Sequence, residues 1–272
     1  MITIRTPKLA VPALGFGTWQ LEGEAAYDPV RTALDVGYRH IDTAQLYHNE
    51  EQVGRAIADA ELDRDEVFLT TKVWRDQAST ADVVTSTQTS LRKLGVDHVD
   101  LLLLHWPSDE IAPLAATLEG LTNAMEQGLT RAIGVSNFPS AKLAEACALA
   151  PIANNQLEHH PFLSVDAVRE VAAANDVVVT AYSPIAQGQV LEDDTLNAIA
   201  DEHEVTPVQV TLRWHLQRGI VAIPRSSNPG RIAANFDVFD FELTDDEVAR
   251  IDALARGGRM IDPPFGIEWD AA

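Results

Sequence analysis

Four side chains that can hold or transfer a proton stand at the expected ends of three successive strands. Asp42 lies in the short segment HIDTA, and Tyr47 follows it in the next loop. Lys72 and His105 stand at the ends of the next two apolar segments, VFLTTKV and VDLLLLHW. In a parallel α/β fold, side chains at the carboxyl ends of neighbouring strands converge where such folds carry their chemistry.

These four residue types can form a general acid. An ammonium is costly to bury alone, so we expect Lys72 to pair with Asp42 on the adjacent strand. A cation beside Tyr47 stabilises the phenolate, so we expect it to lower a phenol pKa that starts near ~10. His105 would orient a carbonyl oxygen or share the proton. Together the four would donate a proton to a developing alkoxide.

Each residue alone also has a purely structural explanation. A lysine–aspartate pair at a strand end is often only structural, and a histidine there is commonly a core or loop residue. A different chemistry is also open, because a buried lysine such as Lys72 can act as the Schiff-base nucleophile of a barrel aldolase. The occurrence of four such groups on three adjacent strand ends favours catalysis.

The rest of the chain predicts the fold that would bring these ends together. Eight predicted strands alternate with helices, without a change in composition, over a length close to the ~250 residues of a (β/α)8 barrel. A doubly wound sheet would need G-x-G-x-x-G in its first turn, but Gly15 and Gly17 are followed by Gln20. We therefore expect an α/β TIM barrel over residues 1–272 as one domain, with a β-hairpin in residues 2–13.

Several helix starts are predicted from their capping residues. Asn49 precedes Glu50 and Glu51 and is expected to cap the helix that follows Tyr47. Capping boxes are expected at Ser79 with Asp82 and at Thr244 with Glu247.

Charge and cysteine content restrict the possible partners and location. The formal net charge of −21, from 41 acidic and 20 basic residues, argues against nucleic acid and anionic membranes as partners. The excess of acidic residues, together with only four lysines among the basic residues, also suggests a high-salt cytoplasm. Cys147 is the sole cysteine, which excludes an intrachain disulfide and fits a cytoplasmic protein. We find no signal peptide or membrane-spanning segment.

The order of motifs along the chain resembles that of the aldo-keto reductases, and especially of bacterial and archaeal members similar to 2,5-diketo-D-gluconate reductases. The matching blocks include LGFGTW, GYRHIDTAQLYHNEEQVGRAI, TTKVW, DLLLLHWP, IGVSNF, NQLEHHP, AYSPI and AIPRS. The resemblance assigns the family's catalytic tetrad to Asp42, Tyr47, Lys72 and His105. It implies that the tyrosine is the general acid, that lysine and aspartate tune it, and that histidine directs the carbonyl.

The resemblance also implies an NADP(H) site. Ser136, Asn137 and Gln156 would hold the nicotinamide amide, and Tyr182 would stack on the ring. At Ala234 this chain departs from the family, which often has a glutamate there that touches the adenine amine. The remaining residues implied to line the cofactor site are Thr18, Trp19, Ser183, Ser226, Ser227 and Asn235.

A phosphate site is predicted from the residues themselves. Asn228 and Pro229 are a typical N-cap and first helical residue, and Arg225 and Arg231 flank that helix start. Helix N-termini bind anions, and arginine binds phosphate through two N–H groups. Two arginines here favour NADPH over NADH, which remains a weaker alternative. The alternative explanation is that both arginines are solvated surface residues that bind no ligand.

Aromatic residues are expected to form the substrate pocket. Four of them lie near the predicted strand ends, and Phe265 and Trp269 in the C-terminal tail are expected to fold back over the rim. His159 and His160 are adjacent on a strand and point to opposite faces, so we expect no metal site there. The four expected pocket residues are Trp19, Trp74, Trp106 and Phe138.

We therefore expect an NADPH-dependent oxidoreductase that reduces small-molecule aldehydes or ketones to alcohols, as a monomer. Two alternatives remain at this stage. One is a non-catalytic NADPH-binding sensor or subunit, and the other is the Schiff-base aldolase. The sequence does not name the substrate.

Overall fold

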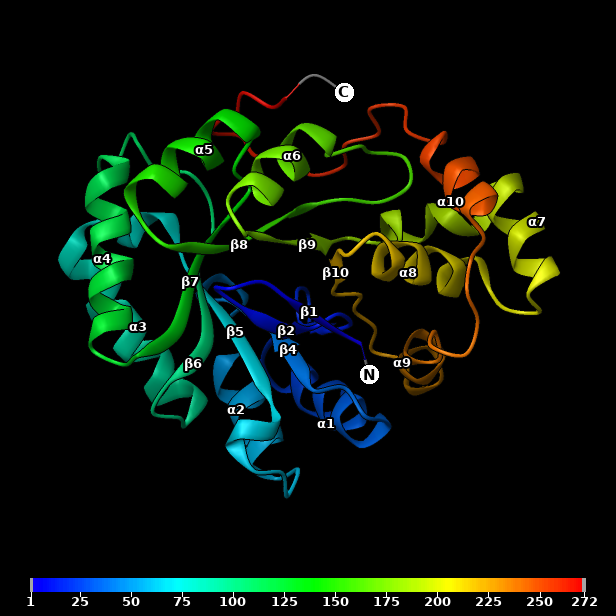
Figure 1. Ribbon diagram of the computed structural model, residues 1–272. Coiled ribbons are helices and arrows are strands. Elements are labelled where there is room, and N and C mark those ends of the chain that lie inside the picture. The colour runs from blue at the N-terminus through cyan, green and yellow to red at the C-terminus, as the bar shows by residue number, and fades with distance from the viewer. Residues whose placement is uncertain (1, 271–272) are drawn as a thin grey trace.

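Eight parallel strands form the centre of the protein in the computed structural model, which describes residues 2–270. They pair in the order in which they occur in the sequence (Figure 1). The sheet curls so far that Leu14, just before β3, bridges Ala222 in β10, and the predicted barrel is confirmed. The strands are β3 (Phe16–Gly17), β4 (His40–Asp42), β5 (Phe68–Val73), β6 (Val99–Leu104), β7 (Thr130–Ser136), β8 (Ile152–Glu158), β9 (Val178–Tyr182) and β10 (Val221–Ala222).

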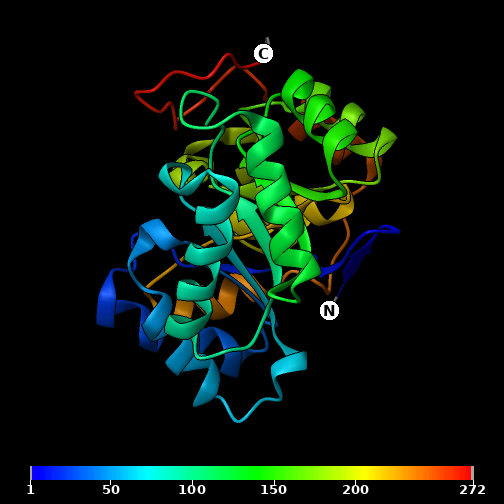
Figure 2. The ribbon, with the colours of Figure 1, turned by 90° about the vertical axis from the view of Figure 1, so that its left-hand side faces the viewer.

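Helices surround the strands, as two perpendicular views show (Figures 1 and 2). No helix within residues 2–270 is long and apolar enough to cross a membrane. The helices are α1 (Tyr27–Val36), α2 (Glu50–Ala58), α3 (Thr80–Leu94), α4 (Leu114–Glu126), α5 (Ser140–Leu149), α6 (Asp166–Ala174), α7 (Asp194–Glu202), α8 (Pro207–Gln217), α9 (Pro229–Phe236) and α10 (Asp245–Asp252).

The run of four leucines in β6 shows how the strands are packed. Side chains alternate along a strand, so two leucines face each side. Leu101 and Leu103 pack into the cluster inside the barrel, whereas Leu102 and Leu104 pack into the cluster beneath the helices. All four are buried, because both faces of a parallel sheet in this fold are covered.

The predicted hairpin, β1 (Thr3–Arg5) and β2 (Ala10–Pro12), is confirmed and covers one end of the barrel. Leu9 and Val11 join the apolar cluster inside the barrel. Lys8 donates from Nζ to the carbonyl oxygen of Ile152, at the beginning of β8. The hairpin therefore closes the amino-terminal end of the barrel, and the carboxyl ends of the strands lie at the opposite end.

Three of the four predicted helix caps are confirmed. Ser79, Thr244 and Asn228 accept hydrogen bonds from backbone N–H groups in the first turns of α3, α10 and α9. Asn49 precedes α2, but its side chain makes no capping bond. Instead its amide donates to the carbonyl oxygens of Thr18 and Leu21. That part of the prediction was wrong, because a buried asparagine can satisfy loop carbonyls as well as helix N–H groups.

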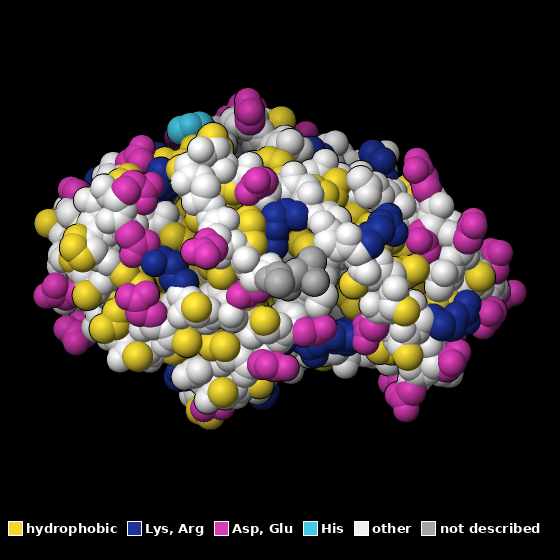
Figure 3. All heavy atoms as spheres, turned by 90° about the horizontal axis from the view of Figure 1, so that it is seen from above, with side chains coloured by type: hydrophobic (Ala, Val, Ile, Leu, Met, Phe, Trp, Pro, Cys, Tyr) yellow, Lys and Arg dark blue, Asp and Glu magenta, His cyan; other side chains and the backbone are white. Residues whose placement is uncertain are grey.

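Acidic side chains are scattered over the face that is seen from above (Figure 3). Fewer basic side chains lie between them on this face. On this face the negative charge is therefore spread widely rather than gathered at one site.

Candidate active site

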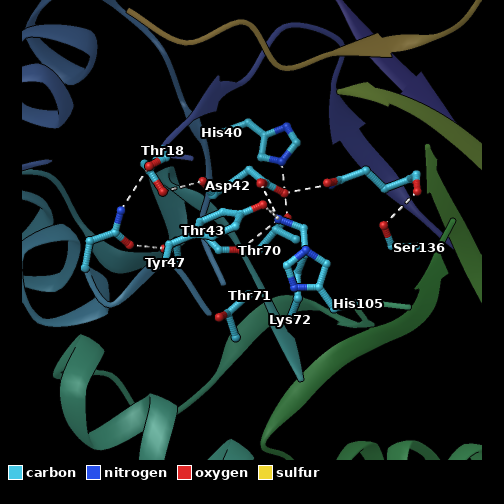
Figure 4. A network of polar contacts seen from close by, with 12 residues as sticks. Thr18, His40, Asp42, Thr43, Tyr47, Thr70, Thr71, Lys72, His105 and Ser136 are labelled. Carbon is cyan, nitrogen blue, oxygen red and sulfur yellow. Dashed lines mark hydrogen bonds and ion pairs between the residues drawn. The ribbon is translucent and has the colours of Figure 1, made fainter. Parts of the chain in front are cut away.

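The four residues predicted to share proton chemistry lie together at the carboxyl ends of β4, β5 and β6 (Figure 4). Lys72 Nζ donates to Asp42 Oδ1 at 2.5 Å and to the Thr43 carbonyl oxygen at 2.9 Å. It also lies 3.3 Å from Tyr47 Oη. The Tyr47 and His105 rings meet edge to face, with centroids 5.6 Å apart. One cation thus links the carboxylate to the phenol.

Burial governs the ionisation of this cluster. It raises the pKa of Tyr47 well above 10, and the Asp42 carboxylate raises that pKa further. The expectation of a lowered tyrosine pKa was therefore wrong in direction. The charge of Lys72 is already balanced by Asp42 at closer range, and burial also lowers the pKa of Lys72 itself. At neutral pH the phenol keeps its proton, which is the form that a proton donor requires.

His105 is neutral in this site. Burial lowers its pKa well below 6.5, and the nearby Lys72 cation lowers it further. Its Nδ1 atom is buried and has no hydrogen-bond partner within the described chain. A neutral imidazole donates from one ring nitrogen and accepts at the other, so its N–H group can hold a carbonyl oxygen in place without giving up a proton.

Gln156 makes a side-chain contact that the sequence did not predict. Its side-chain amide donates to Asp42 Oδ2 at 2.7 Å and so satisfies the carboxylate oxygen that Lys72 leaves free. Its backbone carbonyl accepts from Ser136 Oγ at 2.8 Å. The residue lies at the predicted place, on the strand after Ser136, but its side chain supports the Lys72–Asp42 pair.

The other residues expected at a nicotinamide amide also bond to each other. Asn137 donates to the His105 carbonyl oxygen and to Ser136 Oγ, both at 3.0 Å. Its Oδ1 accepts from Tyr182 Oη at 2.7 Å. Ser136, Asn137 and Tyr182 thus converge beside the tetrad. An amide ligand would fit by exchanging some of these polar contacts.

The predicted phosphate site has the expected helix geometry. Asn228 Oδ1 accepts from the Arg231 backbone N–H at 3.0 Å at the start of α9. Both predicted arginine side chains are exposed, and Arg225 donates to Gln20 Oε1 at 2.9 Å. Across residues 2–270, neither Arg225 nor Arg231 forms an ion pair with a carboxylate. Two cations without a counterion at a helix N-terminus fit a phosphate group.

Smaller polar residues occupy the remaining predicted cofactor positions. Thr18 is fully buried and donates from Oγ1 to the Asp42 carbonyl oxygen. Ser226 is buried and accepts from the Asn228 N–H, whereas Ser227 is exposed. Asn235 is buried in α9, and Ser183 follows β9 with a left-handed backbone, φ 47°.

The four predicted pocket aromatics do not share one environment. Trp74 contacts His105 edge to face, with centroids 5.3 Å apart, and Trp19 is 39% exposed. Trp106 is buried beneath Phe265 and Trp269 of the tail, at centroid distances of 5.5 and 6.3 Å. Phe138 is completely buried in the main hydrophobic core. Trp74 therefore lies against the tetrad, whereas Trp106 packs against the tail.

Two contributions to this region were missed in the sequence. The Thr43 carbonyl oxygen accepts from Lys72, which no side-chain pattern signals. Glu158 ends β8 as a fully buried carboxylate, and its place at a strand end was the available clue. His159 and His160, next in the chain, bond separately to the Leu163 carbonyl oxygen and to Glu158. No three or more His, Cys, Asp or Glu side chains group as metal ligands among residues 2–270.

With this geometry established, comparisons with known proteins are informative. The family model described as "Aldo/keto reductase family" matches residues 13–256. The chain belongs to the aldo/keto reductase family. An aldo-keto reductase of Mycolicibacterium smegmatis is 42% identical over 254 residues, 92% of each chain. The methylglyoxal reductase DkgA of Escherichia coli is 38% identical over 255 residues, again 92% of each chain.

Solved aldo-keto reductase structures share the fold closely. One, provisionally assigned as a 2,5-diketo-D-gluconic acid reductase B, superposes with a TM-score of 0.93 at 42% identity, covering 96% of this chain and 94% of its own. A Bombyx mori aldo-keto reductase in complex with NADP superposes with a TM-score of 0.88 at 35% identity, covering 96% and 95%. This aldo-keto reductase is therefore an oxidoreductase that acts on carbonyl groups.

Proposed function

We propose that this aldo-keto reductase reduces aldehyde and ketone carbonyls with NADPH, and that Tyr47 donates the proton. The observation that carries the proposal is the contact of Tyr47 Oη with Lys72 Nζ, which is itself anchored on Asp42. The bound cofactor would supply the hydride. Tyr47 supplies the proton, and Lys72 stabilises the phenolate that remains.

His105 holds the carbonyl in line with the phenol in this proposal. It lies against both Tyr47 and Trp74, and its lowered pKa keeps it neutral. Trp74 supplies an apolar wall, which excludes water and so strengthens the polar interactions with the carbonyl oxygen.

We further propose that NADPH binds along the carboxyl ends of the later strands. Ser136, Asn137 and Gln156 would hold the nicotinamide amide, and Tyr182 would lie on its ring. Arg225 and Arg231 would hold the 2′-phosphate. The NADP complex of the Bombyx mori relative and the two arginines without ion pairs in the described chain support this assignment.

Replacing Tyr47 with phenylalanine tests the proton donor. Loss of a general acid typically costs about 10²–10⁴-fold in rate, so turnover of a simple aldehyde should fall by that factor. The dissociation constant of NADPH should remain unchanged. Tyr27→Phe is the matched control, because Tyr27 is a surface phenol bonded to Asp59. Turnover of Tyr47→Phe close to that of the control would contradict the assignment.

Turnover, NADPH binding and borohydride trapping together separate the two alternatives. A sensor would bind NADPH and show no turnover with any carbonyl. An aldolase would be trapped on Lys72 by borohydride with a carbonyl substrate. The complete burial of Lys72, with donation to Asp42 and Thr43, weighs against a free nucleophilic amine.

A further inference from the structure

Glu158 is a buried carboxylate that the proposed proton transfer does not use. Its side chain is 0% exposed at the carboxyl end of β8. A buried charge is costly unless several partners compensate it. Its partners therefore indicate what the residue does.

Three of those partners are consecutive residues of the C-terminal tail. Oε1 of Glu158 accepts from the Met260 backbone N–H at 2.8 Å, and Oε2 accepts from that of Ile261 at 3.0 Å. The Arg259 guanidinium lies 3.8 Å from Oε2. Each carboxylate oxygen thus holds one backbone N–H of a segment without helix or strand.

A fourth partner is a histidine of the barrel. His160 Nε2 lies 3.2 Å from Glu158 Oε1, and both side chains are completely buried. Glu158 also pairs in register with Tyr182 on β9. The carboxylate thus belongs to the rigid barrel and faces the tail.

The far end of the tail is also fixed. Asp270 accepts from the Ser140 backbone N–H at 2.9 Å and from its Oγ at 2.5 Å, at the start of α5. We call residues 260–270, held between these two anchors, the tail strap. In Figure 1 the C-terminal segment passes behind α6 and α5.

The tail strap places two aromatic rings against Trp106, which is next to His105 of the tetrad in the sequence. Phe265 and Trp269 both pack edge-on against Trp106, which follows His105 directly. Arg259 lies over the Trp269 ring, 3.6 Å from its centroid. The same residue therefore touches the Glu158 anchor and the ring that reaches Trp106.

From these contacts we infer that Glu158 is a positioning residue, whose carboxylate fixes the tail strap as a wall of the substrate pocket. The inference rests on the proposed function for its kinetic consequence. Glu158 acts through the tail, so its loss should weaken substrate binding and leave the proton-transfer step unaltered.

Glu158→Gln is the main test variant. A glutamine has the same shape, but it can accept from only one tail N–H, and its own NH₂ group faces the other. Loss of a hydrogen bond to a charged group predicts a rise of about tenfold or more in KM for the aldehyde. The expected kcat stays within about twofold, and the NADPH dissociation constant does not change.

Glu268→Gln is the matched control. Glu268 lies in the same tail, is exposed, and forms no hydrogen bond or ion pair within the described chain. It should leave KM and kcat unchanged. A fall in kcat at constant KM in Glu158→Gln would overturn the inference, because it would place Glu158 at the reacting groups or in general folding.

Trypsin cleavage supplies a readout that does not depend on activity. The N–H group of the Arg259–Met260 peptide bond donates to the Glu158 carboxylate. The Arg259 side chain is only 18% exposed. We expect cleavage after Arg259 in folded Glu158→Gln to be about tenfold faster than in wild type or Glu268→Gln. Equal rates would refute the anchor. If wild type reduces no carbonyl, the proposed function fails, and this measurement still decides whether Glu158 holds the tail.

Trp269→Ala keeps the inference testable if Glu158→Gln does not fold. It removes the ring that reaches Trp106 and should also raise KM by about tenfold, with kcat nearly constant. An unchanged KM in this variant would overturn the role of the tail as a wall. In the double variant the two effects should overlap rather than multiply, because both act through one segment. Independent, multiplying effects would count against the inference.

Discussion

Replacing Lys72 with methionine should destabilise the protein far more than the loss of a solvent-exposed ion pair would. The Lys72 and Asp42 side chains are 0% and 2% exposed and meet at 2.5 Å. Methionine fills similar volume but leaves Asp42 Oδ1 without its cation, and Gln156 satisfies only the other oxygen. Removing one partner of a buried pair costs about 3–5 kcal/mol, which sets the expected loss in free energy of unfolding.

Urea unfolding at neutral pH measures this loss, and the chain provides a matched control. Arg55 and Glu24 are 2.8 Å apart, but their side chains are 52% and 70% exposed. Arg55→Met should therefore cost about 0–1 kcal/mol. The double variant Asp42→Asn/Lys72→Met should lose less than Lys72→Met alone, because no uncompensated charge remains. A Lys72→Met loss as small as that of Arg55→Met would refute the argument that this pair is buried and coupled.

Three further predictions concern the cofactor, pH and salt. Arg231→Ala should raise KM for NADPH about tenfold or more while leaving KM for NADH nearly unchanged; equal effects would place the 2′-phosphate elsewhere. Burial lowers the pKa of His40 and of His215 from 6.5 to about 4, so the unfolded chain binds more protons between these values. Stability should be steady above about pH 6.5 and fall towards pH 4 by a few kcal/mol per histidine, with a shallower fall in urea titrations of His215→Gln. The net charge of −21 predicts a higher unfolding temperature in molar KCl than in ~0.1 M salt, and equal temperatures would remove the high-salt proposal.

Residues whose positions follow from the order of strands were predicted well. The tetrad positions depend on which residue ends a parallel strand, and that information is local. The N-cap at Ser79 and the capping box at Thr244 are local too, since the partners lie three residues apart, although Ser79 forms only the N-cap bond and not the reciprocal bond of a box.

Residues whose partners come from distant parts of the chain were not predicted. Asn49 bonds to carbonyls near Thr18, and Gln156 bonds to Asp42 across 114 positions of sequence. Asparagine and glutamine can each donate and accept, so their type does not specify which partner they choose.

The tyrosine pKa shows a second limit of the sequence. Charge types alone suggested that Lys72 would lower the pKa of Tyr47. The structure shows that Asp42 lies closer to this cation and that burial dominates, so the pKa rises. The direction of the pKa shift depends on how deeply Tyr47 is buried and on the distances between the charged groups. Residue types alone specify neither.

The seam between the first and last barrel strands has a consequence for how the chain folds. Successive strands pair with sequence neighbours, but the bond from Gly15 N–H to the Ala222 carbonyl oxygen joins residues about two hundred positions apart. We expect this junction to form late, after the seven neighbouring pairs, since such distant contacts close the longest loop. Arg225, proposed above to bind the cofactor phosphate, follows the junction by three residues, so we expect its segment to become ordered only after this junction has formed. A nascent chain stalled before β10 would therefore contain the four tetrad residues but neither of the two arginines proposed to bind the cofactor phosphate.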